Sequence, residues 1–190
     1  GETMHSLFNS IELVNTQEIE FGKAQWISVD YISEGITIRE TDGDTLILKE
    51  YFNDKNPDYF ARVTTDESGI AIRYGNRPII MNFLKGHIRH HIPKKFFGVL
   101  NGKTSSGKLE MVGRYVLSEL TLSNTSGRIS IGSITSGTVV ISTISGSIDI
   151  GSMQALSNVG TTSGSIRVGN ASGVGENKSV AGSVEDGYKG

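Results

Sequence analysis

The chain has 190 residues, a formal net charge of −2 at pH 7, an apolar content of 36% and no cysteine. Nucleic-acid binding usually needs a basic face, so this slightly acidic balance predicts no nucleic-acid partner. Without cysteine the fold contains no disulfides, and the redox compartment is left open. No apolar run reaches the roughly 18 residues of a membrane-spanning helix.

Residues 1–24 are expected to form an N-terminal strand or cap segment. The opening stretch GETMHSLFNS lacks the basic start and the apolar core of a signal peptide. Because Gly1 is an unusual first residue, our hypothesis is that an upstream signal or membrane anchor has been removed. Contact with a membrane is expected only through such a segment.

Residues 25–103 contain alternating aliphatic residues at irregular spacing. The stretch ITIRETDGDTLIL (residues 36–48) has two aliphatic pairs ten residues apart, separated by Asp-Gly-Asp, and residues 67–74 repeat Ser-Gly followed by alternating aliphatic residues. Alternation with a period of two is typical of half-buried strands. All aromatic residues except Tyr115 and Tyr188 also lie before residue 101. We therefore predict wide, irregular and aromatic coils over residues 25–103.

Residues 104–170 form a regular repeat, in which a pair of alternate aliphatic residues recurs about every nine to eleven residues. Ser-Gly precedes most of these pairs, and glycine adopts the positive φ of a turn at low cost. Each unit therefore predicts a turn and a strand of about four to six residues. The pairs are Leu109/Met111, Leu120/Leu122, Ile129/Ile131, Val139/Ile141, Ile148/Ile150 and Ile166/Val168, with a degenerate unit around Leu156 and Val159. The expected structural turns are at Gly107, Gly127, Gly137, Gly146 and Gly164.

Two architectures are compatible with such a repeat. One unit cannot bury its aliphatic face alone, so units must stack. A sandwich or meander of antiparallel hairpins would alternate strand direction and favour Asn-Gly or Asp-Gly loops. The same turn chemistry before each strand instead favours an all-β, single-stranded parallel β-helix (β-solenoid), with two units in a coil of about 18–20 residues. Parallel β connections are overwhelmingly right-handed, which predicts a right-handed solenoid over residues 25–170.

Residues 171–190 are predicted to form a degenerate C-terminal coil or tail. They keep Ser172-Gly173 but lose the aliphatic pairs, and residues 175–178 (GENK) replace a strand. The last coil of an open solenoid exposes unpaired backbone groups, and charged residues there discourage end-to-end pairing. Because this coil buries little, it is expected to be the least stable part of the fold.

The stretch IPKKFFGVLNGKTSSGKLEM (residues 92–111), followed by recurrent TSGxIxI units, resembles the bacterial putative-adhesin domains of unknown function. The resemblance covers residues 25–170 and implies a β-helix on a secreted or surface-tethered protein. It brings no catalytic residues. In this sequence Ser-Gly is followed by Lys108, Arg128, Thr138, Ser147 or Ser165 in place of the aspartate frequent in that family, so no acidic ladder is expected.

Few residues are candidates for chemistry. In the predicted coils Glu110 and Asp149 share an outer face, but about two coils or 10 Å separate them, which is loose for paired acid–base catalysis. In GHIRHHIP, His87 and His91 share one strand face at about 13 Å, too far apart to bind one metal ion. His90 points to the apolar side. Calcium-repeat and phosphate-loop motifs are absent. We expect no catalytic residue, metal or cofactor.

Two function classes remain. The favoured one is a non-catalytic extracytoplasmic adhesin, or a scaffold that contacts an unknown protein or glycan of the cell envelope. The alternative is a module that binds or acts on envelope polysaccharide. Its site would lie among the N-terminal aromatic residues, which could stack on sugars: Trp26, Tyr31, Tyr51, Phe52, Tyr59 and Tyr74. Lys94 and Lys95 are too few for firm binding to an anionic surface.

Overall fold

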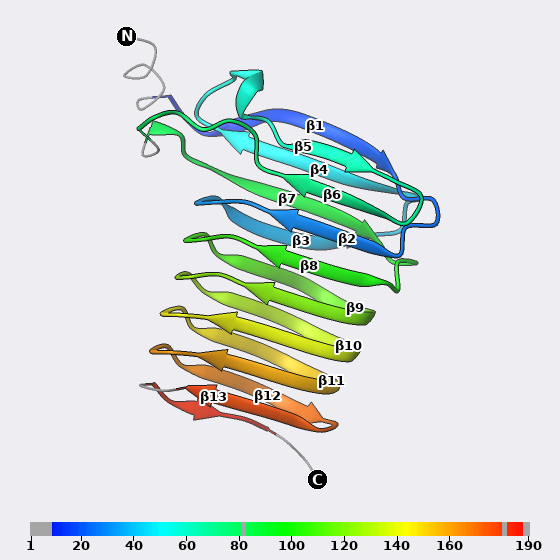
Figure 1. Ribbon diagram of the computed structural model, residues 1–190, viewed down its shortest axis with the longest axis vertical. Helices are drawn as coiled ribbons and strands as arrows, with labels where there is room; N and C mark the ends of the chain where they lie inside the picture. Colours follow the sequence, from blue (N-terminus) through cyan, green and yellow to red (C-terminus); the bar gives the residue numbers. More distant parts are fainter. Residues whose placement is uncertain (1–8, 81–82, 180–181, 188–190) are drawn as a thin grey trace.

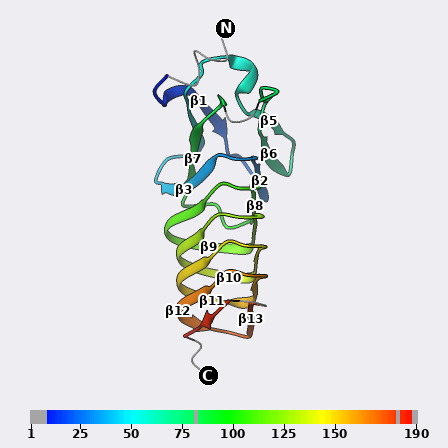
Figure 2. The same cartoon turned by 90° about the vertical axis from the view of Figure 1, so that its left-hand side faces the viewer.

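The computed structural model describes residues 9–80, 83–179 and 182–187. Over these ranges the chain is all-β, as predicted, apart from one short 3-10 helix, η1 (Pro57–Tyr59). The strands form one mixed, curled sheet along the length of the molecule (Figures 1 and 2). They are β1 (Glu12–Glu20), β2 (Trp26–Asp30), β3 (Gly35–Thr41), β4 (Thr45–Phe52), β5 (Arg62–Thr65), β6 (Gly69–Arg73), β7 (Gly86–Pro93), β8 (Val99–Lys103), β9 (Leu109–Ser123), β10 (Ile129–Thr143), β11 (Ile148–Thr161), β12 (Ile166–Ser172), β13 (Gly175–Ser179) and β14 (Val184–Glu185).

Strands β9 to β12 stack in parallel, one below the next, toward the C-terminus (Figure 1). Ile129 pairs with Leu109 on one side and with Ile148 on the other, and Ile148 pairs in turn with Ile166. Equivalent residues are therefore 20, 19 and 18 positions apart along the chain. The predicted coil length and the pairing of equivalent units are confirmed.

The aliphatic pairs face the interior of these coils. Each residue predicted to point inward is at most 3% exposed. Equivalent side chains on successive coils pack on one another, so the repeat buries a continuous core that no single unit could form. The inward residues of the regular coils are Leu109, Met111, Leu120, Leu122, Ile129, Ile131, Val139, Ile141, Ile148, Ile150, Ile166 and Val168.

The strands of the regular coils are longer than predicted. Strand β10 has 15 residues and includes both aliphatic pairs of its coil, and Gly137 lies inside it, not at a turn between strands. The pairing with neighbouring strands shifts register near Gly132 and again across Ser136 and Gly137. Small residues and such bulges let a strand bend sharply without ending its ladder of hydrogen bonds. The expected short strands and the turn at Gly137 are therefore wrong.

The degenerate unit of β11 also differs in detail from its prediction. Ser157 pairs with Val139, and Val159 pairs with Ile141, while Leu156 points outward and is 58% exposed. At the bend before these pairings, β10 carries a bulge of one extra residue that β11 lacks. Because β11 lacks the extra residue, its inward positions fall on Ser157 and Val159. The unit keeps one aliphatic residue and not the expected two.

The N-terminal part departs from a purely parallel arrangement. Strand β2 lies parallel to β6 and β8, and β3 lies parallel to β7 and β9. However, β4 pairs antiparallel with both β1 and β7, and β5 pairs antiparallel with β6. Strand β7 is inserted between β3 and β4, so the Asp42–Asp44 turn spans an intervening strand. The expectation of one-directional coils is therefore wrong for part of residues 25–103.

The last described coil retains strands where their loss was expected. Residues 175–179 form β13, which pairs in parallel with β11, and Val184 and Glu185 pair with Ile166 and Arg167. Backbone pairing with an existing strand does not need aliphatic side chains. Most side chains of β13 are nevertheless exposed, so this coil adds little to the core. Residues 180–181 and 188–190 of the predicted tail lie outside the described residues.

Amide hydrogen exchange is expected to be fast from Gly175 onward and slow across residues 127–150. Strand β10 is hydrogen-bonded on both sides by β9 and β11, whereas among the described residues β13 pairs only with β11. Opening β13 therefore breaks one ladder and exposes little apolar surface. Exchange measured by mass spectrometry or NMR checks this gradient. Equal protection of β13 and β10 would show that the C-terminal coil belongs to the stable core.

Candidate functional site

Each regular coil begins, after its Ser-Gly turn, with a strand segment that presents one polar side chain to solvent. Together these side chains form a row. Strand alternation points the residue between the two buried aliphatic positions outward, and the parallel register aligns these residues from coil to coil. The row is Glu110, Ser130, Asp149 and Arg167, followed by Glu185 in the last coil. This alignment is as predicted from the sequence. Neighbouring members of the row lie on strands about 4.8 Å apart.

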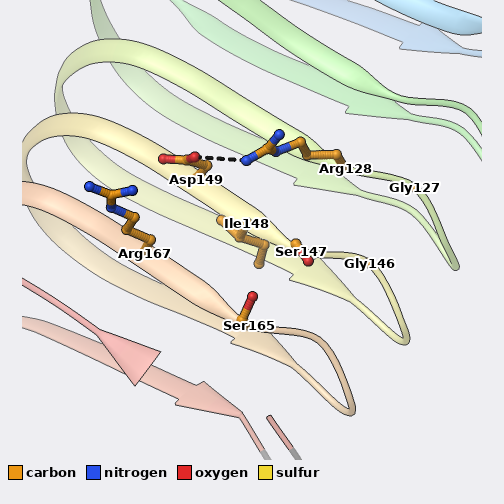
Figure 3. A pocket seen from close by; sticks show the side chains of 8 residues that line it. All are labelled: Gly127, Arg128, Gly146, Ser147, Ile148, Asp149, Ser165 and Arg167. Carbon is orange, nitrogen blue, oxygen red and sulfur yellow. Dashed lines mark hydrogen bonds and ion pairs between the residues drawn. The ribbon is translucent and has the colours of Figure 1, made fainter. Parts of the chain in front are cut away.

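A shallow groove of about 560 Å³ lies on this face, between Arg128 and Arg167 (Figure 3). The Nη2 atom of Arg128 is 3.0 Å from Oδ2 of Asp149, and Arg167 lies beside Asp149 on the next coil. Ser147 and Ser165 line the groove near its Ser-Gly end. The groove therefore offers two guanidinium groups, one carboxylate and two hydroxyl groups to a polar ligand.

The carboxylates of this face are not arranged as a catalytic pair. Glu110 and Asp149 are separated by the intervening strand that carries Ser130. Each carboxylate also has its own cation, since Lys108 is 3.0 Å from Glu110 and Arg128 is 3.0 Å from Asp149. These exposed ion pairs contribute about 0–1 kcal/mol each. The face is better suited to recognition of a ligand than to acid–base chemistry.

The predicted turn glycines lie where successive coils approach most closely. A Cβ atom on any of them would come within 3.0 Å of a backbone oxygen of the preceding coil, a distance that real Cβ atoms essentially never show. For Gly146 this oxygen belongs to Gly127, and for Gly164 it belongs to Gly146. Gly127 in addition has a φ of 105°. Gly107 and Gly137 make the equivalent approach to Glu34 and Ser118.

The N-terminal aromatic residues do not form one exposed platform. Tyr31 and Phe52 are fully buried, at 1% and 0% exposure. Trp26 packs over Gly69 and donates a hydrogen bond to Oγ of Ser68 at 3.1 Å. Tyr31 and Phe52 therefore offer no open face to a sugar ring, whereas Trp26 is half-buried on the outward side of β2.

The other three aromatic candidates are half-buried. The ring of Tyr51 is stacked on His87, with a centroid distance of 4.5 Å, and Tyr74 lies under the guanidinium groups of Arg73 and Arg77. Tyr59 is packed against the core. Of the six candidates, Tyr51 lies on the outer face of β4, beside the charged residues of β7.

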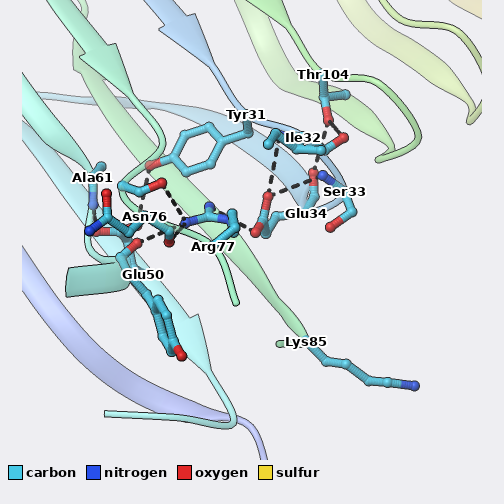
Figure 4. A network of polar contacts seen from close by, with 12 residues as sticks. Tyr31, Ile32, Ser33, Glu34, Glu50, Ala61, Asn76, Arg77, Lys85 and Thr104 are labelled. Carbon is cyan, nitrogen blue, oxygen red and sulfur yellow. Dashed lines mark hydrogen bonds and ion pairs between the residues drawn. The ribbon is translucent and has the colours of Figure 1, made fainter. Parts of the chain in front are cut away.

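A buried ion pair in the N-terminal part was not anticipated from the sequence (Figure 4). The Nη2 atom of Arg77 is 2.8 Å from Oε1 of Glu34, and the two side chains are 6% and 1% exposed. Nη1 of Arg77 also donates to the carbonyl oxygens of Tyr59, Gly75 and Asn76. The pair ties the loop after β6 to the turn between β2 and β3.

Glu50 forms the second acidic centre of this buried cluster. Its carboxylate accepts hydrogen bonds from the Ala61 amide at 2.8 Å and from the Asn15 side chain at 2.9 Å. Burial raises the pKa of Glu50 from its ordinary value. Burial, followed by the nearby Glu50 and Glu34 carboxylates, also raises the pKa of Tyr31. Alternation in TLILKEYF places Glu50 on the same face as Leu46, Leu48 and Phe52, so this signal could have identified it.

The three histidines of β7 divide between the two faces as their alternation predicts. His87 and His91 are partly exposed, whereas His90 is fully buried between Ile88 and Ile92. Neither ring nitrogen of His90 has a hydrogen-bond partner among the described residues. Burial, together with the charge of His91, lowers the pKa of His90 to about 3. His90 is therefore neutral at pH 7 and acts as a core residue.

Acidification is expected to destabilise the protein through His90. A histidine whose pKa is lowered in the folded state contributes stability that is present above the unfolded pKa of 6.5 and is lost as the pH falls toward 3. Between pH 7 and pH 5 the loss should be about 2 kcal/mol. Urea unfolding of the parent and of His90→Leu at both pH values checks this. An equal pH dependence of the two proteins would assign the acid sensitivity to other groups.

The lysines that follow β7 are engaged in exposed ion pairs. Lys94 is 3.0 Å from Asp42, and Lys95 is 2.5 Å from Asp44. They therefore fix the long Asp-Gly-Asp turn across the end of the inserted strand. Phe96 is buried, whereas Phe97 is 61% exposed.

The family model of Toastrack DUF4097 matches residues 24–186. The chain belongs to this family. The DUF4097 match spans both the irregular N-terminal coils and the regular Ser-Gly coils, which confirms the resemblance inferred from the repeat. No curated protein matches the chain at a significant level.

Solved structures with low sequence identity resemble this DUF4097 chain over most of its length. A putative cell adhesion protein from Clostridium sporogenes is 8% identical, with 95% of this chain and 100% of that chain covered and a TM-score of 0.48. A putative adhesin from Parabacteroides distasonis is 11% identical, with 95% and 98% covered and a TM-score of 0.42. Another from Bacteroides fragilis is 16% identical, with 93% and 98% covered and a TM-score of 0.40. Similarities at this level do not by themselves indicate a function.

Two further features are absent from the described residues. No helix among them is long and apolar enough to cross a membrane. The same part of the chain contains no group of three or more His, Asp or Glu side chains placed to hold a metal ion.

Proposed function

We propose that this DUF4097 protein is a non-catalytic, right-handed β-solenoid that acts outside the cytoplasm. Its role is adhesion, or contact with another component of the cell envelope. The observation that carries the proposal is the aligned outer face of the regular coils, where one side chain per coil projects at a fixed spacing. Such a rigid, extended face suits contact with a large or repetitive partner, because its groups are already ordered before binding.

The electrostatics of this face support recognition in preference to catalysis. Two of its carboxylates, Glu110 and Asp149, are each held by a cation, Lys108 and Arg128. Glycosidase-type catalysis instead requires two carboxyl groups that face one scissile bond. The burial of Tyr31 and Phe52 also weakens the alternative of an aromatic active site in the N-terminal part.

Binding of the purified chain to isolated bacterial envelopes tests this proposal. We expect saturable binding and no new reducing ends in the envelope polysaccharide after prolonged incubation. Arg128→Gln/Arg167→Gln removes both cations of the groove on the outer face and should weaken binding, while lowering the free energy of unfolding by no more than about 1 kcal/mol. Release of reducing ends would contradict the non-catalytic assignment, and absence of saturable binding would contradict a role in contact.

A further inference from the structure

A second outward surface lies on the neighbouring strands β4, β7 and β3, and carries only cations and neutral groups at its centre. We name it the basic face and define it by Arg39, Lys49, Arg89 and His91. Lys49 lies directly opposite Arg89, and Arg39 lies opposite His91. Strands in a sheet are about 4.8 Å apart and alternate residues about 7 Å apart. Three permanent cations are thus confined to one small patch.

The cations of the basic face are not neutralised by the protein. Within the described ranges, neither Arg39, Lys49 nor Arg89 forms an ion pair. The outward acids on the flanking strands are Glu18 and Glu20 of β1, which pair with Ile47 and Thr45 of β4, and Glu110 of β9, which is held by Lys108. Like charges directly opposite one another on adjacent strands are destabilising. The Lys49–Arg89 arrangement therefore costs stability that a bound anion would recover.

Aromatic stacking holds one of these cations in place. The guanidinium group of Arg89 lies 4.9 Å from the centre of the Tyr51 ring, and Nη1 donates to the Tyr51 hydroxyl group at 3.4 Å. The ring of Tyr51 is also stacked on the ring of His87, at an interplanar angle of 14°. A guanidinium group ordered by such contacts loses less freedom when it binds an oxyanion.

The surroundings of His91 support the same reading. The pKa of His91 is lowered first by burial and then by Lys49, Arg39 and Arg89. Its Nδ1 atom is also buried without a hydrogen-bond partner. A group surrounded by three cations in this way sits in a local positive potential, although the whole chain has a net charge of −2.

We propose that the basic face binds sulfate, phosphate or carboxylate groups of an anionic polysaccharide, with Arg39, Lys49 and Arg89 as the charge-bearing contacts. In the row across the sheet Thr16 and Thr37 flank Lys49 and Arg89, so hydroxyl groups are available beside the cations for hydrogen bonds to sugar. Membrane insertion would instead need exposed apolar side chains, and Ile47, which lies on the outward side of β4 opposite His91, is only partly exposed. The inference deepens the proposed function by naming the ligand class for the envelope contact.

Titration calorimetry of the purified chain with dextran sulfate, at low salt, tests the basic face. We expect saturable binding that weakens as salt is added, and no binding of uncharged dextran. Lys49→Gln and Arg89→Gln should each weaken binding by about tenfold, because a charge-assisted contact is lost. Lys103→Gln is the matched control, since Lys103 is an exposed cation on β8, away from the patch.

Stability measurements separate binding from a structural role. Because Lys49 and Arg89 repel each other, Lys49→Gln should leave the melting temperature unchanged or raise it. In Arg89→Gln the loss of the contact with Tyr51 offsets this gain, so little change is expected. No binding of dextran sulfate, or equal losses in Lys103→Gln and Arg89→Gln, would overturn the site. Binding to phosphatidylglycerol vesicles but not to dextran sulfate would overturn the ligand class. If the envelopes are bound but dextran sulfate is not, this inference fails while the proposed function stands.

Discussion

Replacing Arg77 by methionine is expected to lower the free energy of unfolding by about 3–5 kcal/mol. The substitution leaves the buried Glu34 carboxylate, which is 1% exposed, without its cation. It also removes the donor to three backbone carbonyl groups and the cation packed over Phe52 and Tyr74. Urea unfolding followed by circular dichroism measures the change.

Two control variants make the Arg77 result interpretable. Arg128→Met breaks an ion pair of similar length, 3.0 Å, whose side chains are 60% and 38% exposed, and should cost at most about 1 kcal/mol. The double variant Glu34→Gln/Arg77→Met should recover part of the loss, because no unpaired charge then remains buried. Equal effects of Arg77→Met and Arg128→Met would show that the buried pair does not fix the N-terminal coils.

Replacing Gly146 by valine should cost about 3 kcal/mol or more, because the coils cannot separate locally to admit the side chain. A Cβ at this position would overlap the carbonyl oxygen of Gly127 on the preceding coil and the Thr143 hydroxyl group. The same close approach of backbone continues at Gly164, one coil further on. Thermal and urea unfolding of the purified variant measure the loss.

Gly160→Val is the matched control for Gly146→Val. Gly160 lies within strand β11, whereas Gly146 lies in the turn before that strand, and the atom nearest to a Cβ at Gly160 would be the Lys178 carbonyl oxygen at 3.6 Å, an ordinary contact distance. This variant should therefore cost much less than Gly146→Val. A parent-like melting temperature for Gly146→Val would mean that glycine is present there for a reason other than close packing of coils.

The regular coils could be predicted in detail because their sequence repeats. Alternation located the inward residues, and the spacing of units gave the register that aligns Ile129, Ile148 and Ile166. The bends were not predicted, since Gly-Ser corners and bulges can either end a strand or curve it. Whether the strand ends or continues through a bend at Gly137 depends on the hydrogen bonds that it makes with the neighbouring strands.

The N-terminal part was less predictable because its contacts are non-local. Nothing in the spacing of residues 36–48 indicates that β7 inserts between β3 and β4. The partnership of Glu34 with Arg77 likewise joins two loops that are distant in sequence. The basic face depends on the same insertion, because Lys49, Arg89 and Arg39 become neighbours only when β7 lies between the other two strands.

Cysteine labelling of two adjacent valines tests the central claim most directly, because the sequence contains no cysteine of its own. Val139 is fully buried and Val140 is 37% exposed on the outer face of β10, so Val139→Cys and Val140→Cys are the same substitution on opposite faces. In intact cells expressing the full-length protein, a membrane-impermeant maleimide should modify Val140→Cys rapidly and Val139→Cys only after unfolding. Labelling of Val140→Cys only after lysis would contradict the extracytoplasmic role, and equal labelling of both folded variants would contradict the coil register.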